Sequence, residues 1–147
     1  GVVISPPDLS ENITLISESI VSCVPGFVQD AAKEALSSAQ MITKEMYSEL
    51  RSRQLSICEE LRSVDNINCQ EPQGSMYVFP CIKDIAISSE KFAFHLLEET
   101  GIACVPGVYF GSGGEGYLRF SSATSYENIK SLGSLLTKAV KTYQETN

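Results

Sequence analysis

The chain has 147 residues, 43% of them hydrophobic, and its 11 Lys and Arg against 18 Asp and Glu give a net charge of −7. This composition predicts one ordinary soluble domain with a real core and excludes two large domains. The acidic balance, without any cluster of Lys or Arg, argues against nucleic acid or an anionic membrane as a partner. No apolar run is long enough to span a bilayer and no secretion signal is present, so the expected location is cytoplasmic.

The first residues are expected to form an apolar strand that is followed by a helix. Residues 1–5 would form this strand, which begins without a preceding turn, as if cut inside a larger protein. Pro6-Pro7 would end it, and Asp8-Leu9-Ser10-Glu11 has the spacing of a capping box. Apolar residues then recur at helical intervals to about Val21.

Two more helices are expected before the middle of the chain. Pro25 suits the first position of a short helix that ends at Ser37-Ser38. A longer helix is expected from about Ile42 to Val64, because apolar residues mark one stripe and charged residues lie elsewhere. This long helix would have a solvent-exposed face and a buried face, and it could join two domains.

The second half of the chain is expected to combine a short sheet with two helices. Turn residues, β-favouring runs and capping signals place strands at 76–79, 102–105 and 117–121, and helices at 88–100 and 124–143. Thr124-Ser125-Tyr126-Glu127 has the spacing of a second capping box. The predicted fold class is therefore α+β, with a short mixed or antiparallel sheet of about three strands covered by helices, after an N-terminal helical segment.

The cysteines and the single histidine do not predict a metal site. The five cysteines are widely spaced and contain no C-x-x-C pair, which favours reduced, partly buried thiols. His95 stands in an apolar helical stretch, which favours a packed histidine over a metal ligand or a general base.

The glycine-rich stretch after the second strand matches a nucleotide-binding motif only by letter. Gly111-x-Gly113-x-x-Gly116 has the dinucleotide spacing, but that motif needs a helix after it, and here a strand follows. The segment is predicted to be a mobile hairpin loop. The functional alternative is a loop whose glycines let the backbone approach a ligand closely.

Arg119 is the residue that carries the sharpest hypothesis. Strand alternation places it on the face opposite Leu118 and Phe120, beside the glycine loop. A guanidinium there could bind a carboxylate through two parallel hydrogen bonds, or it could form a structural ion pair. The lysines fall on polar helix faces or in turns, and none indicates a desolvated nucleophile.

The motifs of the second half resemble, in order, the end of a class I/II aminotransferase, a fold-type I enzyme that uses pyridoxal phosphate. The similar segments are Pro72-x-Gly74-Ser75-Met76-Tyr77-Val78-Phe79-Pro80, the stretch from Phe94 to Gly111 with its Val105-Pro106-Gly107-x-x-Phe110-Gly111, and Gly116-Tyr117-Leu118-Arg119-Phe120-Ser121-x-Ala123. Upstream, residues 22–32 are similar to the segment that follows the family's cofactor-binding region.

This resemblance implies that Arg119 binds the α-carboxylate of an amino-acid substrate and that Gly107, Phe110 and Gly111 belong to an active-site loop. It implies transamination between an amino acid and a 2-oxo acid in a parent homodimer. The lysine and the other groups that hold pyridoxal phosphate would lie upstream, so no catalytic or cofactor-binding residue is expected here and the isolated chain is expected to be inactive.

The resemblance also implies a division of the chain. Residues 1–40 would be a remnant of the large domain, 41–65 an interdomain helix, and 66–147 the small C-terminal domain, whose partner would be the missing large domain. A stand-alone, non-catalytic amino-acid-binding module is the alternative, and a purely structural interaction domain is a third.

Overall fold

The computed structural model describes residues 2–146; within this range the side chains of residues 39–42 lie outside the description. The chain divides into two compact units, Gly1–Lys44 and Glu45–Asn147. The described part of the first unit holds helix α1 and the beginning of helix α2. The second unit holds the rest of α2, the sheet and the core. No helix of the described part carries an apolar stretch long enough to cross a membrane.

Helix α1 spans Pro7–Val21, close to the predicted range, but it does not begin with a capping box. Pro6 is the N-cap residue, no side chain caps the helix, and Asp8 lies inside the first turn. The prediction is wrong by two residues, because proline at the first helical position already has the required φ and needs no partner for an N–H it lacks. No residue of α1 is buried.

The predicted opening strand is not present. Gly1 lies outside the described residues, and Val2 to Ser5 have no regular structure. Val2 is 78% exposed and Ile4 is 96% exposed. A strand needs a hydrogen-bonded neighbour, and no other segment of the described first unit is extended and paired with this one.

The second and third predicted helices form one helix, α2, which spans Gly26–Arg62. The prediction of a break at Ser37-Ser38 is wrong. Both serine hydroxyls donate to carbonyls one turn back, Ser37 to Lys33 at 2.8 Å and Ser38 to Glu34 at 2.7 Å. Serine satisfied in this way remains inside a helix, and neither glycine nor proline follows to end it.

The sheet of the second unit has three short antiparallel strands in the order β1-β3-β2. Strand β1 is Tyr77–Val78, β2 is Val105–Pro106 and β3 is Leu118–Ser121. Tyr77 lies opposite Ser121, and Val105 lies opposite Arg119. The predicted strand at 102–105 begins only at its last residue, where pairing with β3 starts, and Pro106 is tolerated because β2 is an edge strand.

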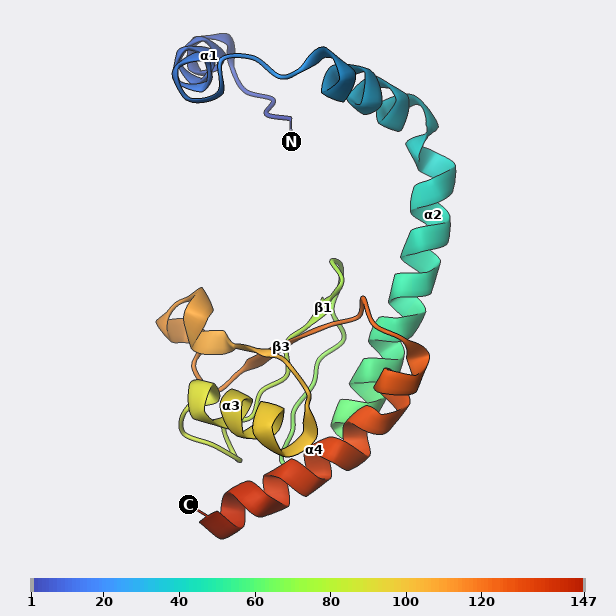
Figure 1. Cartoon of the computed structure of the whole chain (residues 1–147), viewed down its shortest axis with the longest axis vertical. Helices are drawn as coiled ribbons and strands as arrows, with labels where there is room; N and C mark the ends of the chain where they lie inside the picture. The colour runs from blue at the N-terminus through green and yellow to red at the C-terminus, as the bar shows by residue number, and fades with distance from the viewer. Residues whose placement is uncertain (1, 147) are drawn as a thin grey trace. The chain divides into compact units, whose positions relative to one another are not determined.

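Within the described second unit, helices cover one face of this sheet and leave the other open. Helix α3 spans Ser89–Thr100, close to the predicted range of 88–100, with Ser88 as its N-cap and Gly101 in the left-handed region as its C-cap. Helix α4 spans Tyr126–Thr146, and in Figure 1 it lies beside α3 and the last turns of α2. The buried core joins all of these elements through side chains such as Leu61, Val78, Phe92, Leu96, Leu118, Phe120, Ile129 and Leu136. The fold class is α+β, as predicted.

The cap of α4 lies one residue later than the predicted capping box. The Ser125 hydroxyl accepts from the Asn128 backbone N–H at 3.3 Å. The Thr124 hydroxyl accepts from the Asn128 side chain at 3.0 Å instead. The Thr124 carbonyl accepts from Arg53 at 2.7 Å, which holds the turn before α4 against α2 and shifts the start of the helix.

Gln54, a buried amide on α2, holds the segment that leads into β1. Gln54 is only 2% exposed. Its Nε2 donates to the Ser75 carbonyl at 2.9 Å and to the Tyr77 carbonyl at 3.3 Å. These carbonyls belong to no helix, so the amide replaces water as their donor.

Replacing Gln54 with alanine is expected to lower the free energy of unfolding by about 1–3 kcal/mol, because the Ser75 and Tyr77 carbonyls lose the donor that the buried amide supplies. Urea denaturation would measure this loss. Gln70→Ala, at an exposed position, is the matched control and should leave the midpoint within experimental error. Equal midpoints for the two variants would contradict the role of Gln54.

Candidate functional site

Arg119 lies in the middle strand of the sheet, on the face that the helices leave open. Leu118 and Phe120 on either side of it are buried in the core, whereas Arg119 is half-buried. This is the alternation that the sequence predicts for an extended strand with one dry face. Arg119 is therefore aimed away from the helices.

Two aromatic rings cover the Arg119 guanidinium. Its Cζ lies 4.2 Å from the centroid of the Tyr77 ring and 4.7 Å from the centroid of the Phe110 ring. Tyr77 belongs to β1, and Phe110 ends the 3₁₀ turn η1, Gly107–Phe110, which follows β2. Since β1 and β2 flank β3, the rings reach Arg119 from the two neighbouring strands.

Arg119 differs from the other arginines in having no acidic partner. Arg51 and Arg62 form ion pairs with Glu71, and Arg53 forms one with Glu49. Across residues 2–146, Arg119 forms neither an ion pair nor a hydrogen bond from its guanidinium. Of the two alternatives that the sequence left open, the structural ion pair is thus absent from the described part of the chain.

Two parts of the glycine loop, at Gly107 and Gly114, lie so close together that neither position has room for a side chain. A Cβ on Gly107 would collide with the carbonyl oxygen of Gly114 and lie 2.7 Å from that of Tyr117. Gly111 has a φ of 109°, a conformation that side chains rarely adopt. The loop consists of two 3₁₀ turns, η1 and η2 (Ser112–Gly114), and a strand follows it, as the sequence predicts. A dinucleotide-binding motif is therefore excluded, because it requires a helix after the glycines.

Glu115 ties the end of this loop to helix α3. Its Oε1 accepts from the backbone N–H of Ser89 at 2.6 Å and of Gly116 at 2.9 Å. These backbone hydrogen bonds, the one from Ser89 first, lower the pKa of Glu115 below its ordinary value of 4.5. No local sequence pattern indicates this contact, because Glu115 and Ser89 are far apart in the chain.

Glu115→Gln is expected to remove a pH-dependent contribution to stability. Because folding lowers the pKa of Glu115, its contribution is present above the ordinary pKa of 4.5 and is lost as pH falls through the lower folded value. Urea midpoints of parent and variant should therefore differ at pH 7 and converge in acid. Glu98→Gln on the exposed face of α3 is the control. A parent–variant difference that stays constant from pH 7 to pH 3 would refute this origin.

The histidine and the cysteines form no reactive cluster. His95 Nε2 lies 3.0 Å from the Ala139 carbonyl and 3.0 Å from the Thr142 hydroxyl, so it is a packed histidine, as predicted. Burial raises the pKa of the Cys69 and Cys104 thiols to about 12, which makes them poor nucleophiles. The described residues contain no group of ligands that could hold a metal ion.

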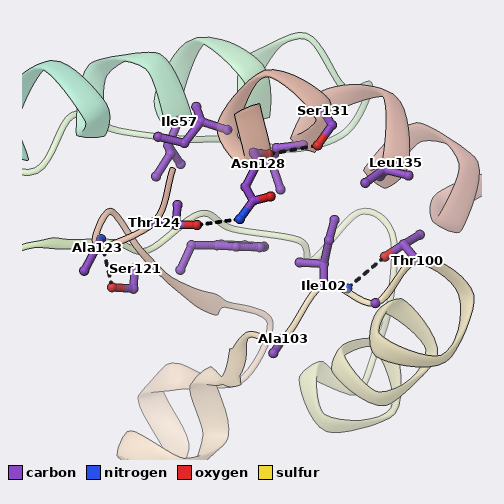
Figure 2. A pocket seen from close by; sticks show the side chains of 14 residues that line it. Ile57, Thr100, Ile102, Ala103, Ser121, Ala123, Thr124, Asn128, Ser131 and Leu135 are labelled. Carbon is purple, nitrogen blue, oxygen red and sulfur yellow. Dashed lines mark hydrogen bonds between the residues drawn. The ribbon is translucent and has the colours of Figure 1, made fainter. Parts of the chain in front are cut away.

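A pocket of about 340 Å³ lies beside the start of α4 and does not include the predicted site residues. Ile57, Thr100, Asn128 and Leu135 are among its lining residues (Figure 2). Its polar groups bond to one another, as Figure 2 shows for Asn128 with Thr124 and for Ala123 with Ser121. No charged side chain is among its described lining residues.

The predicted site residues are only partly brought together. Arg119 and Phe110 are in contact, whereas Gly107 and Gly111 make no such contact and belong to the tightly packed loop around Phe110. Sequence reasoning missed Tyr77 as a partner of Arg119. The signal was available, because Tyr77 and Phe79 flank the buried Val78 and so share the open face of the sheet.

The arrangement defines an α+β domain that presents, on the uncovered face of its sheet, a guanidinium with no ion-pair partner among residues 2–146. The model of the family "Aminotransferase class I and II" matches residues 1–134, so the chain belongs to this family. It is 36% identical to an aspartate aminotransferase of Pyrococcus horikoshii, over 96% of the chain and 37% of that relative. It is 31% identical to aromatic-amino-acid aminotransferase 2 of Thermococcus litoralis, over 96% of the chain and 36% of the relative.

A solved structure agrees with this assignment. An aromatic aminotransferase of Pyrococcus horikoshii superposes with a TM-score of 0.89 and 30% identity, over 97% of this chain and 38% of that one. The chain thus spans less than two fifths of the length of these relatives.

The lysines of the chain do not fit the cofactor that the family uses. A lysine that holds pyridoxal phosphate as an imine is kept from water in a pocket. The lysines here are all solvent-exposed, at positions Lys33, Lys44, Lys83, Lys91, Lys130, Lys138 and Lys141. No step of a reaction is therefore assigned to them.

Proposed function

We propose that this chain is the C-terminal part of a pyridoxal-phosphate-dependent aminotransferase that transfers an amino group between an amino acid and a 2-oxo acid. In this proposal residues 1–40 belong to the large domain, 41–65 form the interdomain helix and 66–147 form the small domain. The parent enzyme is a cytoplasmic homodimer. The family supports this assignment, and the 37% share of the first relative leaves room for the large domain.

Arg119 binds the α-carboxylate of the substrate in this proposal. The observation that supports it is the free guanidinium on the open face of the sheet, with every other arginine already paired to a carboxylate. A guanidinium offers two parallel N–H donors in the plane that a carboxylate needs. The contribution of Arg119 is to hold and orient the substrate, while the loop that contains Gly107, Phe110 and Gly111 borders the site.

The cofactor would be held by residues outside this chain. Pyridoxal phosphate supplies the electron sink that transamination requires. The exposure of the lysines supports the expectation that residues 1–147 alone bind no pyridoxal phosphate and are inactive.

The first test is to read the coding sequence upstream of Gly1 and to measure the intact mass of the native protein. An in-frame extension with a mass well above 16.0 kDa, together with transaminase activity, supports the proposal. A native product of 16.0 kDa without activity would refute the enzymatic assignment. Binding of amino acids through Arg119 would then favour a non-catalytic module.

A further inference from the structure

We infer that Tyr77 and Phe110 are positioning residues that hold the Arg119 guanidinium in one orientation and thereby set the affinity of the site for carboxylates. This inference rests on the proposed function of Arg119, and its test is chosen to separate the two.

The two rings hold the guanidinium from different parts of the fold. Tyr77 is fixed by the β1–β3 pairing, in which it lies opposite Ser121. Phe110 is fixed by the loop after β2, on the other side of β3. Both ring centroids lie within 5 Å of Cζ, well inside the range of about 6 Å for attraction between a cation and an aromatic face.

Phe110 is itself held by a row of aromatic side chains. Its ring meets that of Phe79 edge-on, with centroids 6.1 Å apart and an angle of 82°. Phe79 stacks on Tyr117 at 5.2 Å, and the Lys83 Nζ lies 5.1 Å above the Tyr117 ring. Phe110 is 53% exposed, so burial in the core does not explain its position. The contacts with Arg119 and Phe79 do.

Rings at the faces of a guanidinium act on affinity in two ways. They leave the in-plane N–H groups as the donors that a ligand can reach, which matches the plane of a carboxylate. They also restrict the long arginine side chain before the ligand arrives, so less rotamer entropy is lost on binding. An aliphatic side chain at either position would fill space without the electrostatic attraction of an aromatic face.

The probe for this inference is propionate, which carries a carboxylate and no amino group. Its Kd would be measured by ligand-observed NMR on the native-length protein that contains this chain. Phe110→Leu is expected to raise the Kd about 3- to 10-fold, whereas Phe110→Tyr keeps an aromatic face and should restore affinity to near the parent value.

Phe94→Leu is the matched control, because Phe94 on α3 is 55% exposed and makes no contact with Arg119 among the described residues. It should leave the Kd unchanged. Tyr77→Phe should keep the Kd and Tyr77→Leu should raise it. Thermal unfolding of each variant would show that the changes do not come from a loss of folded protein.

The outcomes distinguish this inference from the proposed function. If Arg119→Ala leaves propionate binding intact, the carboxylate role of Arg119 is wrong and the positioning role falls with it. If Arg119→Ala weakens binding but Phe110→Leu and Tyr77→Leu do not, the rings have no positioning role and the proposed function stands. A rise in Kd for the leucine variants, reversed by Phe110→Tyr, supports both.

Discussion

Arg119→Ala is expected to lower kcat/KM for the amino-acid substrate about 100- to 1,000-fold in the native-length enzyme, through a loss of about 3–4 kcal/mol. The reason is that the guanidinium has no ion-pair or hydrogen-bond partner in the described chain, so in the proposed function its donors are available to the substrate carboxylate. Steady-state kinetics at varied amino acid concentration would measure the change. Arg119→Lys keeps the charge but loses the two parallel donors, and should fall between alanine and the parent.

The control for this experiment is another arginine of the same unit. Arg51 donates to the Pro72 carbonyl at 2.6 Å and pairs with Glu71, so Arg51→Ala should lower stability and leave KM near the parent value. An Arg119→Ala enzyme with parental kcat/KM would show that the carboxylate is bound elsewhere. Equal effects on KM from both variants would point to general disruption.

Gly107→Ala is expected to have the largest effect on the loop. The new Cβ would collide with the Gly114 carbonyl oxygen and crowd that of Tyr117, both of which belong to backbone that cannot turn aside. Strain of this kind costs about 1–3 kcal/mol or more. The backbone hydrogen bond from Gly107 to the Tyr117 carbonyl, 2.8 Å long, would be broken or stretched.

The loss should appear both in urea denaturation and in substrate affinity, because Phe110 follows three residues later in the same 3₁₀ turn. Gly113→Ala is the matched control in the same loop, since a Cβ there has no atom within 4 Å. It should change neither quantity appreciably. If the two alanine variants are equally stable, the close approach of Gly107 to Gly114 does not constrain the loop.

The relatives are described as acting on aspartate and on aromatic amino acids, and they are similar to this chain to comparable degrees. A guanidinium that binds the α-carboxylate would serve all of these substrates alike. Kinetics of the native-length protein with aspartate, alanine and phenylalanine would separate them.

Local patterns in the sequence were sufficient for much of the second unit. Capping signals predicted helices at 88–100 and 124–143, which the structure confirms as α3 and α4, because helix ends depend on neighbours within a few residues. The alternation around Arg119 was equally local. It placed the guanidinium on the face opposite Leu118 and Phe120 without any knowledge of the other strands.

The tertiary structure decided which contacts the locally predicted elements make. Residues 2–5 form no strand, because no other described segment pairs with them. The serines at 37–38 lie within one continuous helix. The position of Tyr77 and Phe110 beside Arg119 depends on the strand order β1-β3-β2 and on the tightly packed glycine loop. Periodicity fixes the face on which a side chain lies, but its contacts come from pairing between residues far apart in the chain, which no local pattern contains.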